Sequence, residues 1–216
     1  MPKSKRRSTK ALTNTNKKGR ELKSQVVESI RGAIDAYKSV YVFSYENMRT
    51  NHFKEVRVAF RDSRFFLGKN KVMKVALGRS NEEEYLTELS KTANDIEGST
   101  GVLCTNQSQE DVEAYFAKTS MISFAKSGFA ATETITIPAG FLSEFVGSMY
   151  ESLHKLGLPV FLNKGQLELT EEYTICTQGE MLTPERAKLL VHFDTPMAEF
   201  KLNLVSRWTE GKYTAY

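Results

Sequence analysis

The segment VYVFSYENMRTNHFKEVRVAFRDSRFFLGKNKVMKVALG, residues 40–78, decides the fold, because within it the chain changes twice from strand-type to helix-type sequence. Its first part, residues 40–45, is β-branched and aromatic, which is typical of a buried strand. Thr50 can then cap a helix whose inner face carries apolar residues at helical spacing. These apolar residues are Phe53, Val56 and Phe60.

The second half of the segment repeats this change. Residues 64–67 predict a second strand, and Gly68 ends it. A short helix opens at Lys69-Asn70-Lys71 and ends at Gly78.

The same alternation extends outward in both directions. Helices are predicted from Glu21, over residues 82–92, and from a capping Ser108 to about Lys118. Residues 101–105 predict a third strand. Helix and strand therefore alternate up to residue 118, which implies a layered α/β domain.

From residue 119 the pattern changes, because Ser, Thr, Ala and Gly dominate and no clear period survives. Beyond that point the sequence predicts a half-exposed strand, a helix, two short strands and a second helix with a Thr-Pro start. The half-exposed strand covers residues 132–137 and the first helix covers 141–155. The two short strands cover 159–162 and 166–169, and the second helix starts at Thr183-Pro184. In residues 200–208 apolar and polar residues alternate, which predicts a last strand. No later element follows with which it could form a core, so we expect this strand to return to the first sheet.

The predicted fold class is therefore α/β (α+β), with a layered domain formed by both chain ends and a smaller mixed insertion domain between them. A chain of 216 residues is long enough for one or two such domains. The predicted parts are a basic disordered arm, 1–20, a discontinuous domain, 21–119 plus 192–216, and an insertion, 120–191.

The strongest functional signal is the charge of the arm. The first 23 residues hold nine Lys and Arg against one acid, a charge of +8 on a chain whose total is +4. This asymmetry favours a polyanionic partner, of which nucleic acid is the commonest. A solubilising or nuclear-import tail is an alternative, and it is compatible with RNA contact.

The turn at Gly68 is the sharpest local signal for phosphate binding. It joins a strand end to a helix start, where backbone N–H groups and the helix dipole favour anions. Mobile charges at Lys69, Lys71 and Lys74 surround it, and arginines precede it. The alternative is an ordinary solvated loop. The RNA-binding candidates are Gly68, Lys69, Asn70, Lys71, Lys74, Arg49, Arg57, Arg61, Lys3, Lys5, Arg6 and Arg7, with Lys126 as a weaker one.

No motif indicates enzyme chemistry, a cofactor or a metal. Ser63 and Asn70 replace two defining residues of a nucleotide P-loop. Cys104 lies within an apolar strand and is expected to belong to the core. The two cysteines form no CxxC pair and the three histidines lie far apart. With no apolar run near the roughly 20 residues of a membrane span, we expect a soluble, intracellular protein.

Six stretches of the chain, taken in order, are similar to those of a known family. They are MPKSKR (1–6), FFLGKNKVMKVALG (65–78), GVLCTNQ (101–107), TITIPAG (134–140), LGLPVFLNKGQLEL (156–169) and LTPERAKLL (182–190). The chain resembles the ribosomal stalk-base protein family, which includes the acidic ribosomal protein P-zero and the bacterial L-ten-like proteins. Within it, the chain resembles the eukaryotic ribosome assembly factors.

The resemblance implies a non-enzymatic role in ribosome biogenesis. It implies binding to large-subunit rRNA at the future stalk-base site of precursor particles, as a placeholder later exchanged for the stalk-base protein. It also implies a nucleolar and nuclear location, with shuttling to the cytoplasm left open. The implied partners are preribosomal proteins, a neighbouring stalk-region ribosomal protein and a release factor, with no membrane.

Two other functions remain open on the sequence. The first is a stalk-base protein of the mature subunit. That protein continues into helices that recruit acidic stalk dimers, whereas this chain stops at Tyr216, so we expect an assembly factor. The second is a small enzyme that acts on RNA, which no metal-ligand or acid/base constellation supports.

Overall fold

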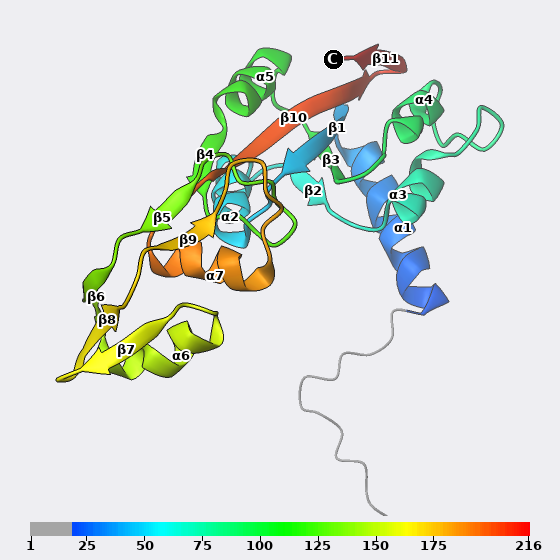
Figure 1. Cartoon of the computed structure of the whole chain (residues 1–216). Helices are drawn as coiled ribbons and strands as arrows, with labels where there is room; N and C mark the ends of the chain where they lie inside the picture. Colours follow the sequence, from blue (N-terminus) through cyan, green and yellow to red (C-terminus); the bar gives the residue numbers. More distant parts are fainter. Residues whose placement is uncertain (1–18) are drawn as a thin grey trace, which may run out of the picture.

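The computed structural model describes residues 19–216, so Lys3, Lys5, Arg6 and Arg7 lie outside the described residues. The described chain forms two lobes (Figure 1). Two strands of the larger lobe, β4 (Ser120–Ser123) and β10 (Ala198–Thr209), lead to and from the smaller lobe. They pair with each other in antiparallel fashion, so the chain leaves and re-enters the large sheet at one place.

The larger lobe is built on a six-stranded antiparallel sheet, in which five strands follow the order β11-β10-β1-β3-β2 and the sixth, β4, pairs with β10 outside this order. The strands are β1 (Ser39–Glu46), β2 (Arg64–Phe66), β3 (Thr100–Thr105) and β11 (Lys212–Ala215). β4 and β11 pair with opposite ends of β10, while β1 pairs with β10 on one side and β3 on the other. The first strand of the chain is therefore held in the sheet by the last long strand.

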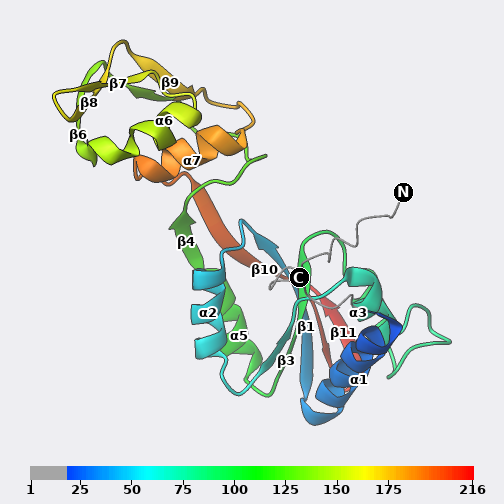
Figure 2. The same ribbon diagram turned by 90° about the horizontal axis from the view of Figure 1, so that it is seen from below.

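Helices cover both faces of this sheet (Figure 2). One face carries α1 (Arg20–Ala36), α3 (Asn70–Leu77) and α4 (Leu89–Asn94), and the other carries α2 (Thr50–Ala59) and α5 (Gln109–Lys118). Because side chains alternate along a strand, Val40 and Val42 pack toward α1, whereas Tyr41 and Phe43 pack toward α2. All four of these side chains are buried, as expected for a strand with both faces covered.

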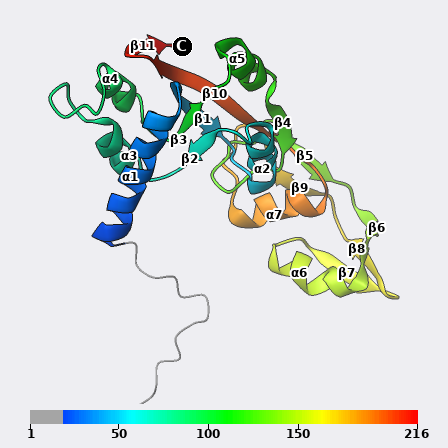
Figure 3. The ribbon, with the colours of Figure 1, turned by 180° about the vertical axis from the view of Figure 1, so that it is seen from behind.

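The smaller lobe has a core of its own. Its elements are β5 (Ile135–Ile137), β6 (Gly140–Val146), a 3₁₀ turn (Gly147–Met149), α6 (Tyr150–Lys155), β7 (Val160–Asn163), β8 (Gln166–Leu169), β9 (Tyr173–Cys176) and α7 (Pro184–His192). Strands β6, β8 and β7 form one sheet, and β5 pairs with β9. Leu153 of α6, Leu167 of β8 and Leu189 of α7 are fully buried in this core. Figure 3 shows that the β6-β8-β7 sheet and α6 lie at the end of the lobe farthest from the large sheet.

These observations confirm the predicted fold class, a mixed α/β layered domain with a second, inserted unit. The predicted return of the last long strand is also confirmed, because β10 pairs with β1 over most of its length. Residues 120–123, which the sequence assigned to the insertion, form β4 and pair with β10. The predicted domain boundaries otherwise stay predictions.

Two predicted helices were wrong in part. Over 82–92 the chain makes turns up to Glu88, and the helix α4 begins only at Leu89. The reason is that the Glu84 carboxylate accepts a hydrogen bond from the Ser90 hydroxyl, 2.9 Å away, instead of facing solvent on a helix. Over 141–155, residues 140–146 form strand β6 because they pair with β8, and only the end of the segment is helical.

Three strands and one capping residue were also predicted incorrectly. β4, β9 and β11 were missed, since each has only four residues and is defined by its partner strand. Thr50 is the first residue of α2, whose N-cap position belongs to Arg49. The caps at Ser108 and Thr183 are confirmed, because each hydroxyl accepts a backbone N–H three residues later. Among residues 19–216 no helix is both long and apolar enough to cross a bilayer.

Candidate nucleic-acid interface

The turn between β2 and α3 presents backbone donors and side-chain cations together. Lys69 is the N-cap of α3, with extended backbone and no side-chain hydrogen bond to the helix start. The first N–H groups of a helix have no intrahelical acceptor, and they carry the positive end of the helix dipole. Lys69 and Lys71 are both exposed beside them. This geometry suits a phosphate group.

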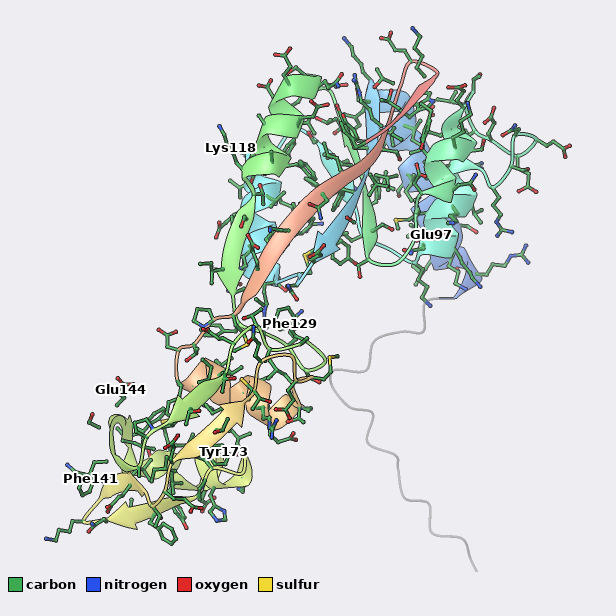
Figure 4. The ribbon with its side chains drawn as sticks, turned by 45° about the horizontal axis from the view of Figure 1, so that its top comes forward. Glu97, Lys118, Phe129, Phe141, Glu144 and Tyr173 are labelled. Carbon is green, nitrogen blue, oxygen red and sulfur yellow. The ribbon has the colours of Figure 1, made fainter. Side chains whose placement is uncertain are left out.

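Two polar residues of α3, Asn70 and Lys74, hold the turn in place. The Asn70 side-chain amide donates a 2.8 Å hydrogen bond to the carbonyl oxygen of Gly98, and the Lys74 ammonium donates one of 3.3 Å to that of Asn94. Asn94 is the last residue of α4, and Gly98 lies in the connection between α4 and β3. Asn70 and Lys74 therefore position the turn, while Lys69 and Lys71 are left to meet a ligand. The α4–β3 connection also carries an exposed acid, Glu97 (Figure 4).

A groove of about 540 Å³ lies beside the turn, between the N-terminal half of α1 and the start of α3. Lys23 of α1, Arg57 of α2 and Lys69 supply its charges. Its apolar wall contains Leu22 and Val26 of α1 and Leu67 of the turn, all 40–42% exposed. The Arg57 guanidinium lies over the Phe53 ring, 5.4 Å from its centroid, which restrains the charge at the rim. We call this feature the α1–α3 groove.

The structure brings only part of the predicted set together. Gly68, Lys69 and Arg57 line the α1–α3 groove, and Lys71 is exposed one residue into α3. Arg61 is exposed between α2 and β2 but does not line the groove. From the sequence, Lys23 was predicted only as one of the charges of the basic arm, and the apolar wall of the groove was not predicted. No sequence signal could have found that wall, because α1 and the turn meet only through the packing of α1 on α3.

Arg49 and Lys126 bind the protein's own backbone. The Arg49 guanidinium donates a 2.5 Å hydrogen bond to the carbonyl oxygen of Phe124, and the Lys126 ammonium donates one of 2.6 Å to that of Met48. A third bond, of 2.9 Å, joins the Asn47 side-chain amide to the carbonyl oxygen of Glu199. These three bonds tie the β1–α2 loop to both chain segments that connect the lobes. RNA contacts of Arg49 and Lys126 stay predictions, and their observed contacts are structural.

We expect Arg49→Ala to lower the free energy of unfolding by about 1–2 kcal/mol, because it leaves the Phe124 carbonyl without its donor. Denaturant unfolding would measure this loss. The matched control is Arg61→Ala, at an exposed position, with an expected change below about 0.5 kcal/mol. Equal losses in the two variants would show that the bond from Arg49 does not stabilise the junction.

Titratable groups of the described residues take part in local structural contacts. Residues 19–216 contain no group of three or more His, Cys, Asp or Glu side chains placed to hold a metal ion. Glu88 and Glu180 have pKa values lowered by hydrogen bonds from Lys91 and from the Thr177 backbone, respectively, which are local structural contacts. Cys104 is fully buried in β3, as the sequence predicted for a core residue.

Burial raises the pKa of the Cys104 thiol to about 12. At pH 8 we therefore expect iodoacetamide to leave Cys104 unmodified in the folded protein and to alkylate it after unfolding, as measured by peptide mass spectrometry. The raised pKa of Cys104 also makes the stability of the fold depend on pH. Because the folded pKa lies above the unfolded value, the stability contributed by the neutral thiol is complete below about pH 9 and is lost toward pH 12. Rapid alkylation of the folded protein would contradict this environment.

Comparison with known proteins defines the class. The family described as "Ribosomal protein L10" matches residues 18–120. A second family, the insertion domain found in 60S ribosomal proteins of the L10 type, matches residues 125–195. The chain is therefore an L10-type protein that carries this insertion domain, in agreement with its two lobes.

Full-length relatives define the family within that class. "Ribosome assembly factor mrt4" of Dictyostelium discoideum is 39% identical over 99% of this chain and 96% of its own length. The Saccharomyces cerevisiae protein of the same name is 32% identical over the same two shares. "Large ribosomal subunit protein uL10" of Thermococcus onnurineus is 24% identical over 88% of this chain and 57% of its own length. The chain belongs to the family of the ribosome assembly factor mrt4, which confirms the resemblance, and this family is a non-enzyme class.

Proposed function

We propose that this protein is a ribosome assembly factor that binds large-subunit rRNA through the β2–α3 turn and the α1–α3 groove. The proposed site is the future stalk base on precursor particles, where the protein acts as a placeholder later exchanged for the stalk-base protein. The observation that carries the proposal is the full-length similarity to mrt4 proteins. The exposed cations at the turn supply a surface of the right chemistry.

The proposed mechanism is recognition of folded RNA by shape and charge, without a chemical step. Neutralising a phosphate releases counterions, with a salt slope on the order of 0.7 to 0.9 per contact. On that rule, six contacts lower the affinity about a thousandfold or more between low and moderately high salt. Binding of this kind is tight in the particle and yields when a competing protein offers equivalent contacts.

A stalk-base protein of the mature subunit is the alternative, because uL10 proteins are similar to 88% of this chain. The mrt4 relative from Dictyostelium aligns over 96% of its length, whereas the uL10 proteins from Thermococcus and Pyrococcus furiosus align over 57% of theirs. This difference favours the assembly factor. Sucrose-gradient sedimentation separates the two: an assembly factor migrates with precursor particles, and a ribosomal component with polysomes.

The proposed location is the nucleolus and nucleus, with shuttling to the cytoplasm. The proposed partners are the stalk-base rRNA, preribosomal proteins, a neighbouring stalk-region ribosomal protein and a release factor. The decisive experiment is ultraviolet crosslinking in cells followed by sequencing of the attached RNA. We expect reads to concentrate in the stalk-base region of large-subunit rRNA, and a spread over unrelated transcripts would reject the proposal.

A further inference from the structure

The outer face of the β6-β8-β7 sheet carries large apolar side chains that are exposed. The inner face of this sheet packs into the core of the smaller lobe through Val160, Leu167 and Leu169, which are at most 1% exposed. On the outer face, Phe141 of β6 and Phe161 of β7 are 58% and 59% exposed. Large apolar side chains that gather on a surface often mark an interaction site.

The two phenylalanines flank one carboxylate. Strand pairing places Phe141 opposite Glu168 on one side, and Phe161 opposite the same Glu168 on the other. Directly paired residues of antiparallel strands point to the same face, so the three side chains form one row across the sheet. With strands roughly 4.8 Å apart, the two phenylalanine backbones are separated by about 10 Å. That spacing leaves room for one planar cation between the rings, above the carboxylate.

Glu168 is held in this row without a cationic partner. The Asn163 side-chain amide donates a 2.9 Å hydrogen bond to one carboxylate oxygen of Glu168. Within residues 19–216 no Lys, Arg or His forms a salt bridge with Glu168. Figure 4 shows Phe141 at the far tip of the lobe, on the side away from the large sheet. The row is thus an anchored anion between two exposed aromatic rings.

The charge of the surrounding lobe decides which partner fits. Residues 125–197 contain five Lys and Arg against nine Asp and Glu, a net charge of −4. A phosphate backbone is repelled by such a surface, whereas a basic polypeptide is attracted to it. Arginine suits the row best, because its planar guanidinium stacks on aromatic rings and pairs with a carboxylate at the same time.

We propose that the row Phe141–Glu168–Phe161 is a docking site for an arginine side chain in a basic segment of a protein partner. The guanidinium lies between the two rings and pairs with Glu168. The site is separate from the α1–α3 groove, so one molecule carries a cationic surface for RNA and an acidic, aromatic surface for protein.

A peptide titration tests the chemistry with full-length protein. The probe is a fluorescein-labelled, acetylated peptide of three Gly-Arg-Gly repeats, and fluorescence anisotropy reports binding. We expect Glu168→Gln to weaken binding about tenfold. Glu172→Gln, at an exposed position of the same lobe outside the row, is expected to change it less than twofold. Equal losses would show only long-range attraction to an acidic lobe and would overturn the proposal, as would equal affinity for a lysine version of the peptide.

Crosslinking in precursor particles tests the partner. A photoreactive benzoylphenylalanine at position 161 is expected to crosslink to an Arg-containing protein segment, and the yield is expected to fall when Glu168→Gln is added. Crosslinks to rRNA or to residues 1–18 of this chain would overturn the proposal. Binding of Glu168→Gln to the rRNA fragment, measured in parallel, is expected to equal that of the unmodified protein, so failure here is distinguishable from failure of the proposed RNA-binding function.

Discussion

The double variant Lys69→Glu, Lys71→Glu is expected to bind its rRNA fragment at least about a hundredfold more weakly than the unmodified protein at moderate salt. Each charge-assisted hydrogen bond contributes about 1.5–3 kcal/mol, and every 1.4 kcal/mol is a factor of about ten in affinity. Both lysines are exposed at the start of α3, and within residues 19–216 neither side chain donates a hydrogen bond, whereas those of Asn70 and Lys74 bind Gly98 and Asn94. The fold is therefore expected to be unaffected.

A titration over several salt concentrations measures both the affinity and its cause. The salt slope of the double variant is expected to fall by about 1.5, because two phosphate contacts are lost. The matched control is Lys118→Glu, Lys188→Glu, which reverses two exposed charges, one at the end of α5 on the opposite face of the sheet (Figure 4) and one on α7 of the smaller lobe. Unchanged affinity of the Lys69 and Lys71 variant, or an equal loss in the control, would show that RNA binds elsewhere.

The largest expected effect on stability belongs to Gly78→Ala, at the end of α3. Gly78 has φ of 108°, in a region that residues with a side chain rarely adopt. A methyl group there would overlap the Glu84 Cα and lie 2.7 Å from the Glu83 carbonyl oxygen, and neither backbone atom can move alone. We expect the free energy of unfolding to fall by about 3–5 kcal/mol, from overpacking and backbone strain together.

Gly98→Ala is the matched control for this effect. Gly98 also has a positive φ, of 61°, but a methyl group there would meet no atom within 4 Å. Its expected cost is about 1–2 kcal/mol, from backbone strain alone. Denaturant unfolding of both variants separates strain from overlap. Similar losses at the two positions would mean that the 79–88 loop moves aside without cost, and that it does not hold α3 as the structure indicates.

Much of the fold could be predicted because local patterns and tertiary packing agree in those places. The buried strand at 39–46, the helix that ends at Gly78 and the helices capped by Ser108 and Thr183 all combine period, propensity and boundary residues. The predictions were wrong where the secondary structure of a segment depends on the strand with which it pairs. Residues 140–146 carry apolar residues at a spacing that suits a helix, and pairing with β8 makes them a strand.

Part of the candidate site could likewise be predicted from the sequence, and part depends on distant contacts. Lys69 and Lys71 could be proposed from sequence, since a glycine turn before a helix exposes the charges that follow it. Arg49 could not be judged from sequence, because its acceptor at Phe124 is 75 residues away. The row of Phe141, Glu168 and Phe161 was also hidden, since it exists only in the register of three strands.

The amino-acid sequence by itself determined the layered α/β class, the return of the last strand, the charge of the arm and the cationic turn. These follow from short-range periodicity, turn residues and charge counts, which act over a few neighbouring residues. Only the tertiary structure decided which cations are free and which bind carbonyl groups, where the α1–α3 groove lies, and which face of the smaller lobe is left open. Those properties depend on contacts between segments far apart in the chain, and they are set by packing and strand register.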